Sequence, residues 1–156
     1  MDEAEATIRR AAPADAGHVA HLLHDFNTEF GEPTPGVLAL AEHAAGMLER
    51  GEMAVLLAGE GPDGISLIRF RTSVWTGQAE AHLQELYVVP PLRGRGIGRA
   101  LLEATLELAR EAGATGIDLN TGETDTAARA LYESCGFSNR EGSPKGPAML
   151  FYEREL

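Results

Sequence analysis

The sequence predicts a single mixed α/β domain spanning residues 1–156, with the element order βααβββαβαββ. Residues 53–89 hold three strand-like runs separated by short turns, too close together for helical crossovers, which indicates an antiparallel meander. From residue 97 onward, amphipathic helices alternate with short strands, which is typical of a right-handed β-α-β crossover between parallel strands. The expected fold is therefore a mixed sheet, antiparallel in its N-terminal half, with the crossover in the middle of the chain.

The chain is expected to begin with a short strand at residues 7–11 ("TIRRA"), followed by two helices. The first helix covers residues 13–30, and Pro13 suits its first turn. Its apolar residues recur at helical spacing: Val19, Leu22, Leu23, Phe26 and Phe30. The second helix covers residues 37–48 and is closed by Gly51.

The meander consists of strands at residues 53–60, 65–75 and 79–89. The "GPDG" turn joins the first two, and a turn at Thr76-Gly77 joins the second to the third.

The second half is expected to form a helix over residues 97–112, a strand over 115–120 and a helix over 124–135. Strands at residues 137–141 and 148–155 complete the chain.

Composition excludes several classes of protein. The chain has 24 acidic and 13 basic residues, a net charge of −11, which argues against general nucleic-acid binding and is compatible with a cationic substrate. No apolar run approaches the length of a membrane span, and the acidic start "MDEAEAT" is unlike a targeting segment. Cys135, a single cysteine, excludes an internal disulfide and favours a reducing compartment, so we expect a cytoplasmic protein.

One basic stretch stands out in this acidic chain. Residues 86–102, "LYVVPPLRGRGIGRALL", contain no Asp or Glu, and three arginines lie among three glycines between a predicted strand and a predicted helix. A helix N-terminus exposes unpaired N–H groups, and glycine lets an anion approach the backbone. The loop therefore indicates a polyanionic ligand such as a pyrophosphate, the alternative being a glycine-rich turn with solvated arginines.

Two other phosphate motifs fit less well. A P-loop would need Lys followed by Ser or Thr after the last glycine, where Arg99-Ala100 stands. A dinucleotide fingerprint would start at Gly94 and Gly96 but would place Arg99 where the third glycine permits close helix packing. Asp118 has a suitable distance for a ribose contact, yet it falls inside a predicted strand.

Two stretches of the chain, Arg93-x-x-Gly96-x-Gly98 and "DTAARALYESCGF" at residues 125–137, resemble signatures of the GNAT family of acyl-CoA-dependent N-acetyltransferases. Arg93-x-x-Gly96-x-Gly98 is similar to the family's (Gln/Arg)-x-x-Gly-x-(Gly/Ala) signature. A second resemblance is to the family's Asn-x-x-Ala-x-x-Leu-Tyr followed by Gly-Phe; the matching residues are Asp125, Ala128, Leu131, Tyr132, Gly136 and Phe137. The two motifs and the element order extend the likeness over essentially the whole chain.

The resemblance implies acetyl-CoA as cosubstrate, no metal, and a homodimer. The backbone of one loop would cradle the pyrophosphate of coenzyme A: Arg93, Gly94, Arg95, Gly96, Ile97, Gly98 and Arg99. Main-chain groups of Leu86, Tyr87 and Val88 would pair with the pantetheine arm, and the Val88 N–H would polarise the thioester carbonyl.

The same resemblance places Asp125 and Ala128 beside the cofactor and gives Tyr132 the role of protonating the departing thiolate. Asp125 departs from the usual Asn, because an ionised carboxylate only accepts hydrogen bonds. It would suit a helix N-terminus. Cys135 lies on the apolar stripe of its helix and is expected in the core.

The chemistry needs a proton acceptor, since an alkylamine is almost wholly protonated at neutral pH. Glu85, just before the residues that would pair with the cofactor, is the candidate; ordered water, with Glu85 as a solvated strand residue, is the alternative. The family's acceptor pocket draws on the first two helices and their connector. Candidate acceptor-binding residues are Asn27, Phe30, Glu32, Trp75 and His82.

His18, His21 and Asp25 share one face of the first predicted helix, which we interpret as its solvated side rather than a metal site. The expected function is acetyl-CoA-dependent N-acetyl transfer to a primary amine of a small molecule or protein, by direct attack in a ternary complex. A non-catalytic acyl-CoA-binding sensor is the alternative. Neither a nucleic acid nor a membrane is expected as partner.

Overall fold

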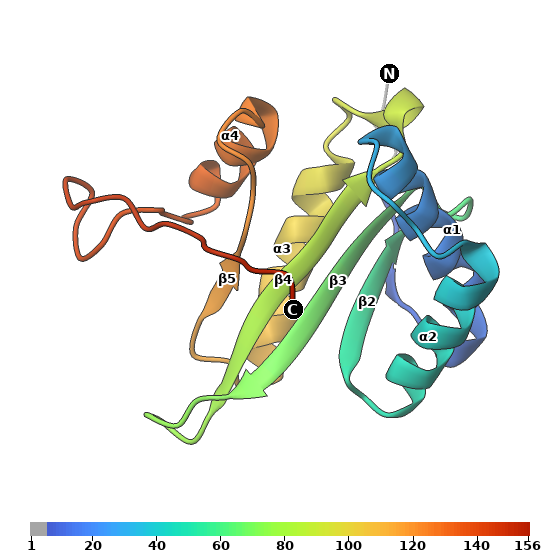
Figure 1. Cartoon of the computed structure of the whole chain (residues 1–156), viewed down its shortest axis with the longest axis horizontal. Coiled ribbons are helices and arrows are strands. Elements are labelled where there is room, and N and C mark those ends of the chain that lie inside the picture. Colours follow the sequence, from blue (N-terminus) through green and yellow to red (C-terminus); the bar gives the residue numbers. More distant parts are fainter. Residues whose placement is uncertain (1–5) are drawn as a thin grey trace. The chain divides into compact units, whose positions relative to one another are not determined.

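The computed structural model in Figure 1 describes residues 6–156. The first five residues, which belong to the acidic segment considered above, lie outside this range. The chain forms two compact units, one ending at Leu119 and one running from Asn120 to Leu156. The single-domain organisation of residues 1–156 stays a prediction.

The first unit is built on a five-stranded sheet in the order β1-β2-β3-β4-β5. Its strands are β1 (Ile8–Arg10), β2 (Met53–Ala58), β3 (Gly64–Thr72), β4 (Ala79–Val88) and β5 (Ile117–Leu119). The first four pair antiparallel, and β4 and β5 pair parallel. The predicted meander and the later switch to parallel pairing are both confirmed.

Helices cover both faces of this sheet, as Figure 1 shows. They are α1 (Ala16–Glu29), preceded by a 3-10 turn at Pro13–Asp15, then α2 (Val37–Glu49) and α3 (Ile97–Glu111). On one face, Val19 and Leu22 of α1 pack with Val55 and Leu57 of β2 in a single apolar cluster. On the α3 face, the buried hydroxyls of Ser66 and Thr105 form a hydrogen bond of 2.6 Å. Because both faces are covered, all six residues of β2 are buried.

The strand β4 contains a β-bulge that changes which side chains face α1 and α2. Leu67 of β3 pairs with Glu85, but the next residue, Ile68, pairs with Leu83, so Gln84 is the extra residue. In an unbroken strand, His82 and Glu85 would face opposite sides, being three residues apart. The bulge restores them to the same face, which is also the face of Leu67 and Tyr87.

The second unit contains one helix, α4 (Thr126–Ser134), where a helix was predicted. The two strands predicted at residues 137–141 and 148–155 are not formed. Those segments meet only at an antiparallel bridge between Arg140 and Ala148, flanked by a hydrogen bond of 2.7 Å from Met149 N to Asn139 O. An isolated pair of strands without a packed face is marginal, so favourable β-propensity alone does not produce two strands here.

Across residues 6–156, every helix is too short or too polar to cross a bilayer.

Candidate active site

The glycine-arginine loop leads directly into α3. Gly94 and Gly96 have φ values of +77° and +84°, in the left-handed region that favours glycine. Gly96 is the N-cap of α3, and its carbonyl accepts the first helical hydrogen bond, from Ala100 N at 3.0 Å. The N–H groups of Ile97 and Gly98 therefore have no acceptor within the helix. A glycine cap offers no side-chain oxygen to them, so the helix start is suited to an external anion.

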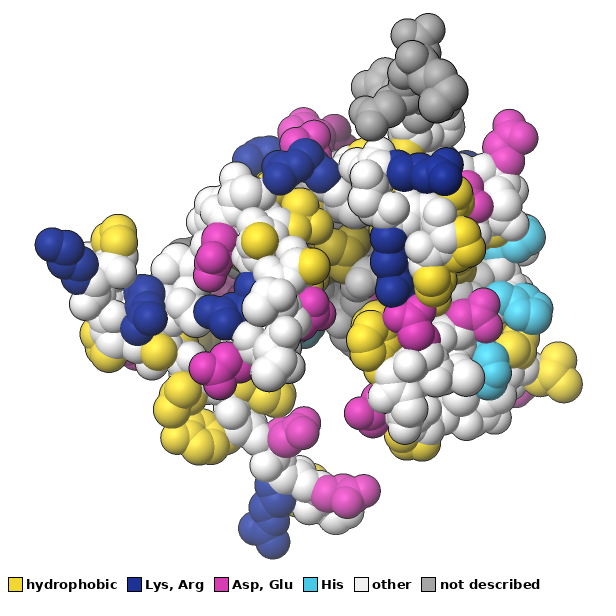
Figure 2. Space-filling view, turned by 90° about the horizontal axis from the view of Figure 1, so that it is seen from above, with side chains coloured by type: hydrophobic (Ala, Val, Ile, Leu, Met, Phe, Trp, Pro, Cys, Tyr) yellow, Lys and Arg dark blue, Asp and Glu magenta, His cyan; other side chains and the backbone are white. Residues whose placement is uncertain are grey.

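Arg93 anchors this loop rather than projecting freely from it. Its Nε donates to Val88 O at 2.9 Å, and its two Nη atoms bind the Glu29 carboxylate at 2.8 and 2.9 Å. The hydrogen bond from Arg93 is the main reason that the pKa of Glu29 is lowered. The guanidinium thus ties the loop to the end of β4 and to the last turn of α1. Lys and Arg side chains, in dark blue, lie exposed on the face of the molecule that Figure 2 shows.

Tyr87 completes this connection between α1 and β4. Its ring is buried edge-on against Phe26, with the centroids 5.0 Å apart, and Arg93 lies over it at 5.4 Å. The Tyr87 hydroxyl donates to Glu29 Oε1 at 3.3 Å. Burial and the nearby Glu29 charge raise the pKa of Tyr87, so this phenol stays protonated at neutral pH.

The end of β4 exposes main-chain groups along one edge. Val89 N donates to Asp63 O at 3.0 Å, toward β3. Because main-chain groups alternate in direction along a strand, those of Leu86 and Val88 point away from β3. The parallel partner β5 pairs with β4 only at residues 81–83. Within residues 6–119, no strand covers the outer edge of Leu86 and Val88, and the Val88 carbonyl accepts the hydrogen bond from Arg93 given above.

Glu85 is half-buried on the face that α1 and α2 cover. Burial raises the pKa of its carboxyl, and the positive charge of His82 partly opposes this rise. A carboxyl whose ionised form is disfavoured in this way is a stronger proton acceptor than an exposed one.

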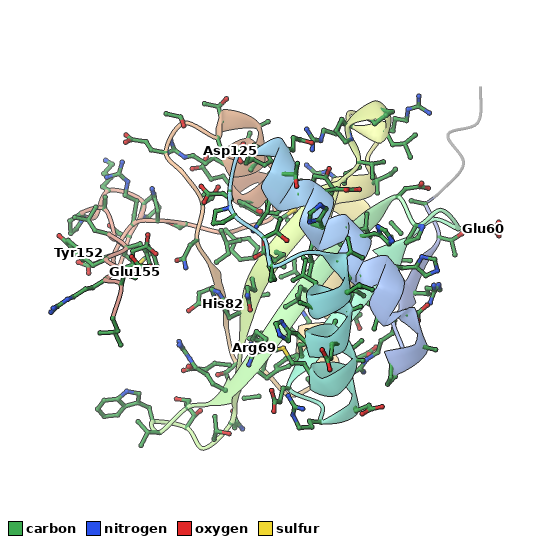
Figure 3. The ribbon with its side chains drawn as sticks, turned by 45° about the vertical axis from the view of Figure 1, so that its right-hand side comes forward. Glu60, Arg69, His82, Asp125, Tyr152 and Glu155 are labelled. Atoms are coloured by element: carbon green, nitrogen blue, oxygen red, sulfur yellow. The ribbon has the colours of Figure 1, made fainter. Side chains whose placement is uncertain are left out.

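A cluster of charged side chains lies beyond Glu85, toward the start of β4. His82 Nδ1 lies 2.5 Å from Asp118 Oδ1 of β5, and Arg71 of β3 contacts Asp118 at 3.4 Å and Glu80 at 2.9 Å. Figure 3 shows His82 on β4 and Arg69 on β3, residues that are paired in the sheet. A shallow hollow of about 330 Å³ lies at this end of the sheet, lined by residues that include Arg71, Glu80 and Asp118.

Three of the predicted acceptor-binding residues lie at the C-terminal end of α1 and in the connector after it. Asn27 donates its side-chain N–H to Pro33 O at 3.0 Å, Glu32 N donates to Asn27 O at 2.8 Å, and Phe30 packs edge-on against Phe26. This is the end of α1 that binds Arg93 through Glu29.

The structure does not bring Trp75 to that place. Trp75 is 92% exposed and lies in the β3–β4 turn, next to the first residue of β4. Val88 is the last residue of that strand. The length of β4 separates them by roughly 30 Å at strand geometry.

In the second unit, Asp125 caps α4. Its Oδ1 accepts from Ala128 N at 3.3 Å, and Figure 3 labels it at the start of that helix. This confirms that the carboxylate suits a helix N-terminus. The predicted stripe of Ala128, Leu131, Tyr132 and Cys135 is the less exposed side of α4. Tyr132 packs edge-on against Phe137 with the ring centroids 5.9 Å apart.

His18, His21 and Asp25 are exposed on α1. Figure 2 shows histidine side chains, in cyan, grouped on one side of the surface. Among the residues that the structure describes, no three His, Cys, Asp or Glu side chains gather as a metal site would require.

Comparison with known proteins decides the family. The profile of the acetyltransferase (GNAT) family matches residues 18–137. The chain belongs to the GNAT family. A thialysine N-epsilon-acetyltransferase of Caenorhabditis elegans is 29% identical over 85% of this chain and 82% of its own length. An aminoglycoside N(6′)-acetyltransferase type 1 of Stenotrophomonas maltophilia is 32% identical over 86% and 88%.

A solved structure from Arthrobacter sp. FB24, assigned as an acetyltransferase, superimposes with a TM-score of 0.89 at 47% identity, covering 98% of this chain and 97% of the other. This GNAT protein is therefore an acyltransferase of the N-acetyltransferase type, which confirms the predicted family, fold class and enzyme class. The comparisons favour the enzyme over the non-catalytic sensor.

Two residues beside the predicted site residues, Glu29 and Asp118, carry little signal in the sequence. Glu29 carries no motif, although its place in the last turn of α1, between Asn27 and Phe30, could have indicated it. The sequence spacing of Asp118 suggests only a ribose contact, and its pairing with His82 depends on the β4–β5 register, which the sequence does not reveal.

Proposed function

We propose that this GNAT protein transfers an acetyl group from acetyl-CoA to a primary amine by direct attack in a ternary complex. The observation that carries the proposal is the conjunction of a glycine-capped helix start at Gly96 with the open main-chain edge of β4 at Leu86 and Val88. A cosubstrate with a pyrophosphate at one end and an amide-bearing arm at the other matches both features.

In this arrangement the N–H groups of Ile97 and Gly98 at the start of α3 bind the pyrophosphate of coenzyme A. Arg95 and Arg99 add positive charge beside it, while Arg93 holds the loop in shape through Val88 and Glu29. Leu86 and Val88 bind the amides of the pantetheine arm through their outward main-chain groups. The Val88 N–H polarises the thioester carbonyl, which favours attack by the amine.

Glu85 is the proposed proton acceptor, because its half-buried carboxyl has a raised pKa on the face beneath α1 and α2. The resemblance to the family assigns Tyr132 of the second unit as the donor to the departing thiolate. Asp125 caps α4 through Oδ1, and its Oδ2 remains to accept a hydrogen bond from a pantetheine N–H.

The proposed acceptor is a small molecule with a primary amine that is protonated at neutral pH. Two relatives are named for thialysine and for aminoglycosides, both amine-bearing small molecules. The chain's net charge of −11, with Glu32 and Glu85 near the proposed acceptor side, would attract a cation. The single cysteine leads us to propose a cytoplasmic location. The resemblance to the family leads us to propose a homodimer, and sedimentation would test the oligomeric state.

The test is turnover of acetyl-CoA against a panel of amines, with release of free thiol as readout. The panel spans amino acids, polyamines, aminoglycosides and peptide N-termini, each beside a neutral or anionic analogue. We expect thiol release with at least one cationic amine. Tight acetyl-CoA binding without turnover across the panel would support the sensor instead, and a preference for neutral or anionic amines would contradict the proposed acceptor class.

A further inference from the structure

Asp118 and His82 form a cross-strand pair on the face that carries Glu85. The two residues are direct partners in the parallel β4–β5 register, and His82 Nδ1 lies 2.5 Å from Asp118 Oδ1. The bulge at Gln84 is what turns His82 to the side of Glu85. When the imidazole is protonated, its charge lowers the pKa of the Glu85 carboxyl.

Other charged groups face this pair from each neighbouring strand. On β3, Arg71 contacts Asp118 Oδ2 at 3.4 Å, and Arg69 is the sheet partner of His82. Arg69 is held by a hydrogen bond of 2.8 Å from its Nε to Glu52 O. On β4, Glu80 binds Arg71 at 2.9 Å. The Asp118 carboxylate therefore has one oxygen toward the imidazole and one toward a guanidinium.

The proposed reaction must deliver one proton to solvent in each turnover. The ammonium first loses a proton, and its nitrogen lone pair forms the N–C bond to the thioester carbonyl. The nitrogen loses a second proton as the C–S bond breaks and its electron pair leaves on sulfur. One proton ends on the thiolate, so the products are an N-acetyl amine, free coenzyme A and one released proton.

Glu85 is poorly placed to release that proton by itself, because its carboxyl is half-buried and burial raises its pKa. The His82 side chain is 32% exposed and that of Asp118 is 58% exposed, so the pair reaches solvent. With Nδ1 directed to Asp118, the nitrogen left to accept a proton is Nε2.

Building on the function proposed above, we propose that Asp118 is a positioning residue. It holds the His82 imidazole so that His82 takes the proton from Glu85 and passes it to water. The alternative role for Asp118 is structural, as the point where Arg71 ties β3 to β5.

The experiment compares Asp118→Asn, His82→Gln and the double variant with Glu80→Gln as matched control. Glu80→Gln breaks the contact of Arg71 to β4 but leaves the contact between His82 and Asp118. We expect Asp118→Asn to lower kcat about tenfold with both KM values within twofold. His82→Gln should lose at least as much, and the double variant no more than His82→Gln, because Asp118 acts through His82. Glu80→Gln should keep kcat.

The pH profile reports whether His82 acts on Glu85 during the reaction. Removing the His82 charge leaves the Glu85 carboxyl protonated to higher pH, so in His82→Gln the rising limb of kcat/KM should move upward in pH. Asp118→Glu, which keeps the carboxylate, should regain part of kcat and tests the role of this residue even where Asp118→Asn melts early.

Full kcat in a folded Asp118→Asn, losses that multiply in the double variant, or an unmoved limb in His82→Gln would each overturn the inference. An inactive wild-type protein would overturn the proposed function with it. Active wild-type protein with full activity in Asp118→Asn would overturn this inference alone.

Discussion

The substitution Gly96→Val separates backbone strain from ligand binding at the start of α3. Gly96 has φ +84°, and a Cβ added at this position would meet no other atom within 4 Å. The cost of valine in the free protein is therefore conformational. A left-handed conformation costs an L-residue about 1–2 kcal/mol, and the β-branch of valine adds to this. For a chain of this size we expect a fall in Tm of roughly 2–8 °C with the fold kept.

The larger effect should be on acetyl-CoA, because a branched side chain would stand where a phosphate meets the backbone. We expect affinity to fall at least tenfold, about 1.4 kcal/mol, by isothermal calorimetry. Gly113→Val is the matched control, since Gly113 has φ +78°, an equally open surrounding, and a place beyond the other end of α3. It should lose similar stability and keep its affinity. Equal affinity in both variants would refute the idea that this loop binds the pyrophosphate.

Three further substitutions test single groups. Tyr132→Phe should lower kcat about tenfold, about 1.4 kcal/mol, with Tm and cosubstrate affinity little changed. A normal kcat, measured where chemistry limits turnover, would show that Tyr132 serves only to pack against Phe137. Glu85→Gln should lower kcat on the order of a hundredfold and abolish the rising limb of kcat/KM. That limb should lie above the usual range of a glutamate, since burial raises the pKa of Glu85; an intact limb in the variant would point to ordered water as the base. Arg93→Ala should lower stability by about 1 kcal/mol and weaken acetyl-CoA several-fold, whereas Arg50→Ala, which breaks the exposed pair with Glu52, should leave affinity unchanged.

The regular part of the fold could be predicted because it depends on local patterns. The positions of α1, α2 and α3 follow from apolar spacing, and the meander follows from its short turns. The absence of the two final strands could not be predicted by the same means. Residues 148–155 have favourable β-propensity, but a strand forms only where a partner supplies hydrogen bonds along its length.

The local geometry of the candidate site follows from the sequence where it depends on main chain, but not where it depends on strand register. Gly94 and Gly96 adopt the left-handed conformations that glycine in such a loop suggests. The bulge at Gln84 carries no sequence signal, yet it decides that Glu85 and His82 share a face. The sequence presents Arg93 as one of three cations available to an anionic ligand. In the structure its guanidinium is ion-paired with Glu29, which is distant in the sequence.

The central claim is that acetyl-CoA binds along the open edge of β4 and at the start of α3. Its most direct measurement is a titration of the ¹⁵N-labelled protein with acetyl-CoA, following each backbone amide by NMR. The account predicts saturable shifts of the amides of Leu86, Val88, Gly96, Ile97 and Gly98, all with one dissociation constant, while the amides of β1 stay in place. Saturable binding that leaves the amides of Val88, Ile97 and Gly98 unmoved would contradict it.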